Sequence, residues 1–220
     1  MRRTKAESEK TRQHILITAR REFAAHGLTR TTMQRIARAA GVSRGAVYWH
    51  FANKRELFRV MRDQVSLPLF DRVDVGESER DPLAAVERFL HGLVDRIESD
   101  AQTRSTLDIL SLRCEYVDEF RPELVKHMKR CAELQRKLVA LYQRARDSGT
   151  LRNDLAPDAA ALGTTVFIVG MLRLWLIDRG RTYARGAIDA LIASHVAVLR
   201  PPGGGKTCNA VERDGVSLLK

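Results

Sequence analysis

The hydrophobic positions near the N-terminus follow the spacing of short helices separated by turn residues. Over residues 10–26 the apolar side chains recur with the period of one helix face, and Gly27 marks the end of that helix. The pair Thr31 and Thr32 offers an N-cap for a second helix, with Gln34 in the capping-box position relative to Thr31. The pattern therefore predicts one long helix followed closely by a short one.

Two more helices complete the predicted N-terminal unit. Gly41 ends the second helix in a tight turn, and Ser43 caps a third helix that runs to Phe51. Asn53 caps a fourth helix, whose apolar positions fall on one face: Leu57, Phe58, Met61 and Val65. Two short helices joined by a glycine-containing turn are the pattern of a helix-turn-helix that reads DNA.

The rest of the chain keeps the helical period, and no segment alternates convincingly with the period of a half-buried strand. The fold is therefore predicted to be all-α. The helices expected after the fourth span residues 83–98, 104–117, 123–148, 158–177 and 184–199. The Pro- and Gly-rich sequence that opens the segment 200–220 predicts a disordered tail.

Charge is distributed unevenly along the chain. Residues 1–62 contain 15 Lys and Arg against four acidic residues, whereas the remaining residues contain 23 basic and 23 acidic ones. The whole net charge of +11 thus lies in the first 62 residues, where it favours a phosphate backbone or an anionic membrane surface. This division predicts a helix-turn-helix DNA-binding domain over 1–62, joined by the fourth helix to a larger ligand-binding and dimerisation domain over 63–199.

Within residues 32–54 the side chains divide into a packing set and an outward set. The packing set joins the three helices and comprises Ile36, Ala37, Ala40, Val42, Val47 and Phe51. The outward set comprises Gln34, Ser43, Arg44, Gly45, Tyr48, Trp49, His50 and Lys54. Arg44 stands at the start of the third helix, where its planar guanidinium can donate to O6 and N7 of guanine. Tyr48 and His50 can bind phosphates, and Lys54 adds positive charge at a helix N-terminus.

The sequence that resembles a known family runs from Thr32 to Leu57 and reads TMQRIARAAGVSRGAVYWHFANKREL. It is similar to the DNA-binding domain of TetR-family transcriptional regulators, and its YWHF segment is similar to the AcrR and TtgR branch, repressors of multidrug efflux pumps. The resemblance implies that bases are faced by Gln34, Arg44, Gly45 and Tyr48, and that the DNA backbone is held by Thr32, Trp49, His50 and Lys54. For single residues an alternative stays open: Tyr48 and Trp49 as core aromatics, and His50 as a solvated surface histidine.

The second predicted domain has no excess of charge and consists of apolar helices, so its expected roles are dimerisation and sensing. Gly163 and Gly170 lie on one face of the helix 158–177, where they would let a partner helix approach closely. Together with Ala187, Leu191 and Val198 of the last helix, they predict an intersubunit four-helix bundle, which is the usual dimer contact in the family. The alternative is that both glycines serve packing within one subunit.

Arg173 is a charged side chain in an otherwise apolar helix, so it must be paired or solvated. A structural ion pair with Asp108 or Asp178 and a ligand-binding role are both open. The runs Met171–Trp175 and Arg113–Tyr116 resemble pocket-lining helices of TtgR-type regulators. This resemblance implies that a small hydrophobic or aromatic inducer contacts Leu107, Ser111, Ile168, Leu172 and Arg173. The TtgR-type pattern has Asn and His at the first two of these positions, so a more apolar pocket is expected here.

Other functional classes find little support in the sequence. The apolar segment 159–177 contains Thr164, Thr165 and Arg173, so we expect a buried helix and no membrane span. The charged N-terminus predicts no signal peptide, and three cysteines without a CxxC pair suit the cytoplasm. Gly203–Thr207 lacks the spacing of a P-loop, and the six histidines show no metal-ligand spacing. No cofactor, metal or catalytic residue is predicted, and the protein is not expected to be an enzyme.

Together these patterns and the resemblance predict a ligand-responsive repressor that binds double-stranded operator DNA as a homodimer and is released by its inducer. The resemblance implies control of a multidrug efflux operon, with a shift passing through the fourth helix to the paired recognition helices. A TetR-type regulator of a catabolic or lipid gene, an activator and an architectural DNA-binding protein are the open alternatives. The large neutral second domain argues against the last of these.

Overall fold

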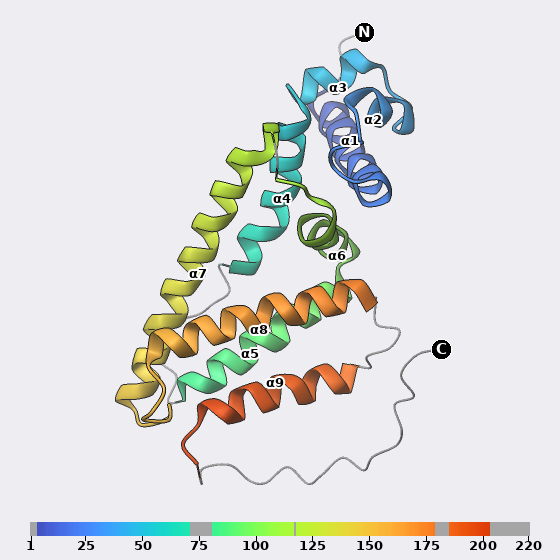
Figure 1. Ribbon diagram of the computed structural model, residues 1–220. Coiled ribbons are helices and arrows are strands. Elements are labelled where there is room, and N and C mark those ends of the chain that lie inside the picture. Colours follow the sequence, from blue (N-terminus) through green and yellow to red (C-terminus); the bar gives the residue numbers. More distant parts are fainter. Residues whose placement is uncertain (1–3, 71–80, 117, 179–184, 203–220) are drawn as a thin grey trace.

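The computed structural model describes residues 4–70, 81–116, 118–178 and 185–202. Within these ranges the chain contains helices and no strands, as the sequence predicted (Figure 1). At one end of the molecule lie α1 (Lys5–His26), α2 (Met33–Ala39) and α3 (Arg44–His50), and α4 (Lys54–Phe70) leads away from them. The larger part contains α5 (Pro82–Ser99), α6 (Ala101–Asp108), α7 (Arg121–Asp147), α8 (Pro157–Asp178) and α9 (Arg185–Leu199).

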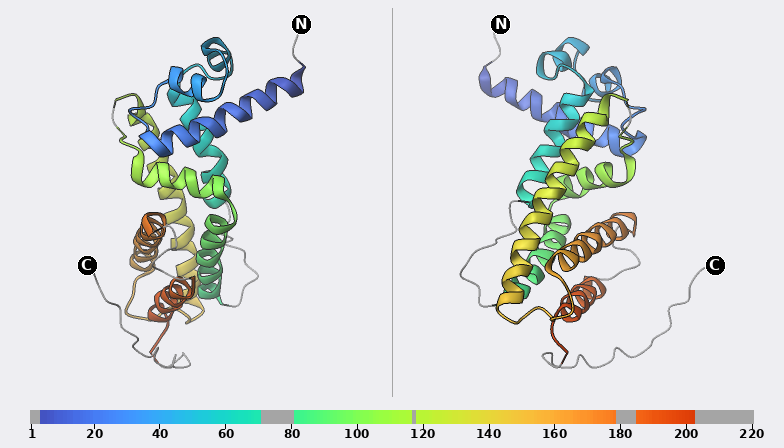
Figure 2. Two further views of the ribbon diagram at one scale, coloured as in Figure 1. Left: turned by 90° about the vertical axis from the view of Figure 1, so that its right-hand side faces the viewer. Right: turned by 60° about the vertical axis from the view of Figure 1, so that its left-hand side comes forward.

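The first helix begins earlier than the apolar pattern predicted. Thr4 is its N-cap: the Thr4 hydroxyl accepts from the Glu7 amide at 3.2 Å, and the Glu7 carboxylate accepts from the Thr4 amide at 2.8 Å. This capping box starts a polar first half that projects from the body of the molecule (Figure 2), while the buried positions begin at Ile15. The signal Thr-x-x-Glu was present in the sequence, but it lies outside the apolar repeat.

The N-cap of α2 is the second of the two threonines that the sequence offered. Thr32 is the N-cap, and its hydroxyl accepts from the amide of Arg35 at 3.1 Å. Thr31 is fully buried and donates its hydroxyl proton to the carbonyl of Gly27 at 2.7 Å. The predicted capping box between Thr31 and Gln34 is therefore wrong, because the side chain of Thr31 faces the protein interior.

The other local signals of the helix-turn-helix are confirmed. Gly41 adopts φ = 64°, a left-handed conformation that glycine reaches without strain. The Ser43 hydroxyl accepts from the Ala46 amide at 3.1 Å, and the Asn53 side chain caps α4. Of the predicted packing set, Val42 is partly buried and the other five are buried: Ile36, Ala37, Ala40, Val47 and Phe51. We call residues 4–62, which surround this core, the head.

The remaining helices enclose a second hydrophobic core. It joins α5, α7, α8 and α9 through side chains such as Leu90, Leu138, Ile168 and Ile192. A polar chain crosses it, because the buried Tyr142 hydroxyl contacts Thr164, whose hydroxyl lies 2.9 Å from Nε2 of His195. The core thus fixes α8 and α9 against α5 and the C-terminal part of α7, and these segments lie together in the lower part of Figure 1.

The segment predicted as one helix over 104–117 has a different structure. Asp100 caps α6, which ends at Asp108; a π-helical turn, η1 (Ile109–Arg113), and a short 3-10 helix, η2 (Asp118–Phe120), follow. Ile109 and Phe120 are buried in the core of the head, and the Arg113 carbonyl accepts from the Leu28 amide at 3.3 Å. The helix is diverted because these contacts hold the chain against the head; position 117 lies outside the described residues.

The prediction that the apolar helix 158–177 is buried holds for one of its faces only. Of the described helices, α8 alone is long and apolar enough to meet the criteria for a membrane span. Ala161, Ile168 and Trp175 belong to the second core, whereas the opposite face exposes Leu162, Val166, Val169, Leu174 and Ile177. The prediction missed this because both faces are apolar. Position 184 of the last predicted helix and positions 203–220 of the predicted tail lie outside the described residues.

Candidate nucleic-acid interface

The outward face of α3 presents the side chains that the sequence assigned to DNA. Tyr48 is 41% exposed and Trp49 is 73% exposed, so the alternative that they are core aromatics is wrong. The Arg44 guanidinium carbon lies 5.3 Å from the centre of the Tyr48 ring, a cation–π arrangement that orients the guanidinium along the face of the helix. His50 is partly buried and packs edge-on against Trp49, with ring centres 4.6 Å apart.

The small and hydroxyl residues of this face are compatible with a close approach of DNA. A methyl group added to Gly45 would meet no atom closer than the Ser43 Oγ at 3.9 Å, so nothing within the protein requires glycine there. Thr32 and Ser43 accept the amide hydrogen bonds that cap α2 and α3. Each hydroxyl carries one proton, and as an exposed donor it can serve a phosphate oxygen.

Lys54 lies at the edge of the same face, and the protein already surrounds its ammonium group. The Lys54 Nζ donates to the carbonyls of Leu28 at 3.0 Å and Thr29 at 3.3 Å. It also lies 3.5 Å from a carboxylate oxygen of Glu119 and 5.3 Å from the centre of the Phe120 ring. Lys54 therefore connects three elements: the turn between α1 and α2, the start of α4, and η2.

A groove of about 400 Å³ connects these groups, and five of the predicted DNA-binding residues line it: Thr32, Gln34, Arg44, Tyr48 and Lys54. Its lining also includes Glu119, a carboxylate that sequence reasoning missed. Glu119 is far from the helix-turn-helix in sequence and comes from η2, so the motif contains no signal for it. The groove brings cationic, hydroxyl and aromatic groups to one surface of the head.

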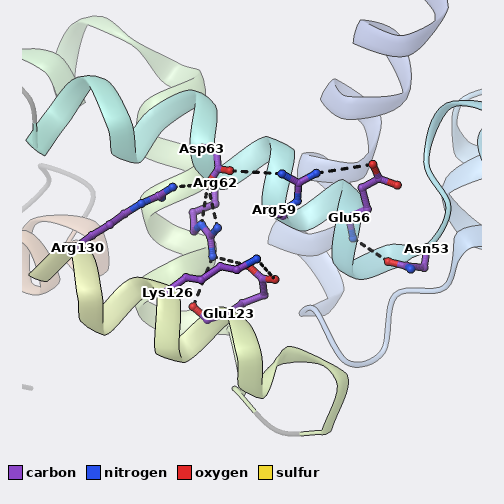
Figure 3. A network of polar contacts seen from close by, with 8 residues as sticks. All are labelled: Asn53, Glu56, Arg59, Arg62, Asp63, Glu123, Lys126 and Arg130. Atoms are coloured by element: carbon purple, nitrogen blue, oxygen red, sulfur yellow. Dashed lines mark hydrogen bonds and ion pairs between the residues drawn. The ribbon is translucent and has the colours of Figure 1, made fainter.

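The middle of α4 is fixed to the N-terminal part of α7 by a network of charged groups (Figure 3). The Arg62 guanidinium donates to the Glu123 carboxylate at 2.6 Å, and the two side chains are only 1% and 2% exposed. Arg62 and Arg130 also donate to Asp63, each at 2.9 Å. Burial opposes the charge on Asp63, but the hydrogen bonds from Arg130 and Arg62 outweigh it and hold the pKa of Asp63 below its usual value. These hydrogen bonds and ion pairs hold α4 and the N-terminal part of α7 in a fixed position relative to each other.

The predicted ligand-binding residues come from α6, η1 and α8. Ile168 is buried in the second core, and Leu107 and Leu172 are partly buried against it. Ser111 and Arg173 are exposed, and the Arg173 guanidinium donates to the Ser111 carbonyl at 3.3 Å. Asp108, one of the two carboxylates considered as partners of Arg173, accepts from Arg113 at 2.9 Å. The structure thus joins two of the five residues directly and places the other three in or against the second core.

The predicted dimer residues lie on the outer face of α8 and α9. Leu191 and Val198 are exposed large apolar side chains, and Ala187 is exposed on the same helix. A methyl group added to Gly163 or Gly170 would meet no atom within 4 Å, so packing within one chain does not require either glycine. This face is open in the single chain.

Comparison with known proteins agrees with this geometry. Residues 15–61 match the profile of bacterial regulatory proteins of the tetR family, and residues 81–200 match the C-terminal region of MAATS-type transcriptional repressors. The chain is 30% identical to the transcriptional regulator TtgR of Pseudomonas putida over 202 residues, 91% of this chain and 96% of TtgR. It is 36% identical to a probable acrEF/envCD operon repressor of Escherichia coli over 179 residues, 80% of each chain.

A solved structure with a similar fold is NalD, described as the secondary repressor of the MexAB-OprM multidrug efflux pump in Pseudomonas aeruginosa. The TM-score is 0.77 with 30% sequence identity, and the match covers 90% of this chain and 100% of NalD. The similarity therefore extends over both the head and the second core.

Proposed function

The chain belongs to the TetR family of bacterial transcriptional regulators, and we propose that it represses a promoter as a homodimer that a small apolar or aromatic inducer releases from DNA. The observation that carries this proposal is the exposed face of α3, where Arg44, Tyr48 and Trp49 project from the domain that holds the net positive charge. Exposed aromatic and cationic groups on a short helix after a tight turn suit entry into the major groove. No catalytic role is proposed.

For the contacts with DNA we propose the division that the family resemblance implies, with the exposed hydroxyl of Ser43 added to the residues that hold the backbone. Gln34, Arg44, Gly45 and Tyr48 face the bases, with Arg44 donating to guanine as the most discriminating contact. The DNA backbone is held by Thr32, Ser43, Trp49, His50 and Lys54. Contacts of the second group position the head on the duplex without reading sequence. The DNA-binding domain in this proposal comprises residues 1–62, with 63–199 for ligand binding and dimerisation.

The outer face of α8 and α9 supports the homodimer. Its large apolar side chains would be buried by the same face of a second copy, which is the geometry of a two-fold symmetric interface. Gly163 and Gly170 would allow the two α8 helices to approach closely. In such a dimer two α3 helices meet two half-sites of an operator, and the apolar face of α8 is accounted for without a membrane.

Inducer release follows from the way that α6 and η1 join the two cores. A ligand held by Leu107, Ser111, Ile168, Leu172 and Arg173 would touch the segment whose next residues, Ile109 and Arg113, contact the head. A ligand that prefers a shifted position of this segment would move the head and change the separation of the recognition helices. Ligand and DNA would then oppose each other with the same coupling free energy, typically about 1–3 kcal/mol.

We propose a multidrug efflux operon as the target, and the cytoplasm, where the operator is, as the location. The support is the role described for NalD and the identity with TtgR and the operon repressor over most of the chain. The inducer would be a small apolar or aromatic molecule, because apolar side chains dominate the predicted contacts.

The experiment is fluorescence anisotropy of the purified protein on a labelled duplex from immediately upstream of its own gene, with a random duplex as control. We expect a dissociation constant of about 10⁻⁸ M or tighter at physiological salt, and release by one member of a panel of hydrophobic antibiotics and dyes. Binding no tighter than to the random duplex would sink the local-repressor proposal. Tight binding that no panel compound releases would sink the efflux assignment and favour a catabolic or lipid gene.

A further inference from the structure

The groove that contains the predicted DNA-binding residues also contains one carboxylate, Glu119. Its negative charge opposes the binding of a phosphate, whereas the cationic groups of the groove favour it. Glu119 lines the groove together with Arg44, Tyr48 and Lys54, and its side chain is 48% exposed. A phosphate oxygen that approached Lys54 would meet the negative charge of Glu119 at the same place. The carboxylate and the phosphate would repel each other, and this repulsion is strongest at low salt.

The position of Glu119 is set by a buried neighbour. Phe120 is 3% exposed and packs edge-on against Phe58 of α4, with ring centres 5.5 Å apart. A few residues further, Glu123 at the start of α7 forms the buried ion pair with Arg62 of α4. The backbone at Glu119 is therefore held against the start of α4, where Lys54 lies, while the exposed carboxylate can still rotate away.

We propose that Glu119 competes with the DNA backbone for Lys54 and so limits how tightly the head holds DNA; the inference rests on the proposed function. In the free protein the Lys54 ammonium has three oxygen neighbours among the described residues, and of these Glu119 supplies the one with a full negative charge. On the duplex a phosphate replaces the carboxylate, and Glu119 turns to solvent.

The test is the affinity of Glu119→Gln for DNA as a function of salt, measured by anisotropy on the upstream duplex and on a random duplex. Glu115→Gln is the matched control: Glu115 is an exposed carboxylate in the same segment, and it accepts from the Thr29 hydroxyl outside the groove. Both variants gain the same net charge. Circular dichroism and thermal unfolding check that each variant is folded, and Glu119→Ala serves as a second replacement.

For Glu119→Gln we expect binding about 4–10-fold tighter at low salt, since exposed ion pairs are weak and a dimer contains two of them. The slope of log K against log salt should steepen by up to about 0.9 per protomer, the value for one additional neutralised phosphate. Both duplexes should show the same factor, because a phosphate contact does not read sequence. In a Lys54→Gln background the replacement of Glu119 should give no gain beyond that of Glu115→Gln.

A change of less than two-fold relative to Glu115→Gln, or an equal gain in the Lys54→Gln background, would overturn the inference. These outcomes are separate from a failure of the proposed function. If the wild type does not prefer the upstream duplex, the repressor proposal fails, but the competition at Lys54 is still decided on the random duplex.

Discussion

Replacement of Arg62 by Met tests the charge network between α4 and α7. The variant keeps an unbranched apolar side chain but removes the donor to Glu123, a carboxylate that is 2% exposed. Lys126 is then the remaining partner described for Glu123, at 3.4 Å, and its side chain is half exposed. Asp63 loses less, because Arg130 still donates to it at 2.9 Å. The loss of stability in Arg62→Met therefore arises mainly from the buried Glu123 carboxylate, which keeps only the half-exposed Lys126 as a compensating charge.

Breaking a buried ion pair from one side costs about 3–5 kcal/mol. Glu123→Gln should cost less, about 1–2 kcal/mol, because it removes a charge-assisted hydrogen bond but leaves no buried charge without compensation. Arg62 would keep its two hydrogen bonds to Asp63, at 3.0 and 2.9 Å. The double variant should lose less free energy of unfolding than the sum of the losses in Arg62→Met and Glu123→Gln. The reason is that Arg62→Met is destabilising mainly while Glu123 is charged.

The assay is urea and thermal unfolding at one fixed protomer concentration, because dimer stability depends on concentration. For a chain of this size about 2–4 °C in Tm corresponds to 1 kcal/mol, so Arg62→Met should lower Tm by about 6–20 °C. Arg59→Met is the control: the Arg59 side chain is 42% exposed, its nearest carboxylate atom is 3.7 Å away, and its loss should cost under about 1 kcal/mol. Equal costs for Arg62→Met and Glu123→Gln, or a cost for Arg62→Met no larger than that of Arg59→Met, would refute the reasoning.

Three further predictions concern the DNA contact, the dimer and the pH dependence. Arg44→Ala should weaken binding to the preferred duplex by about 5–150-fold per protomer, since each half-site loses one bidentate base contact, and much less for a random duplex in the same anisotropy assay. Val166→Glu should convert the dimer to monomer by sedimentation analysis, because Val166 is 64% exposed on the outer face of α8, whereas the exposed Val125→Glu on α7 should leave it dimeric. Burial lowers the pKa of His195, so the unfolded chain takes up this proton first as the pH falls below about 6.5. Between pH 7 and pH 5 the wild type should then lose more stability in urea unfolding than His195→Gln.

Each of these has a result that would contradict it. An equal loss of affinity for both duplexes would make Arg44 a backbone contact. A dimeric Val166→Glu protein would move the interface away from α8. Parallel pH profiles for the wild type and His195→Gln would show that the proton on His195 has the same affinity in the folded and unfolded chain.

The sequence predicted the head well because its signals are local. Gly41, Ser43 and Asn53 fix turns and caps within a few residues of themselves, and the apolar repeat fixes the buried faces of α2 and α3. Once the buried positions of α3 are known, the remaining positions are expected to face solvent. Tyr48 and Trp49 are among them, and both are exposed as the DNA-binding prediction requires.

The features that sequence reasoning missed depend on contacts between distant segments. The helix expected over 104–117 ends early because Ile109 is buried among residues of the head and the Arg113 carbonyl accepts from Leu28. Asp108, which the sequence offered as a possible partner of Arg173, pairs with Arg113 in that diverted turn. Glu119 reaches the groove by the same diversion. Periodicity describes which face of a helix is apolar, but it does not describe which core that face enters.

Transcription in vitro tests the central claim most directly: the promoter immediately upstream of the gene is transcribed by purified polymerase with increasing amounts of the protein. The account predicts that transcript falls as the protein occupies the operator, that Arg44→Ala fails to lower it at the same concentrations, and that an inducer restores it. A transcript level that stays constant or rises while the wild-type protein occupies the promoter fragment would contradict repression.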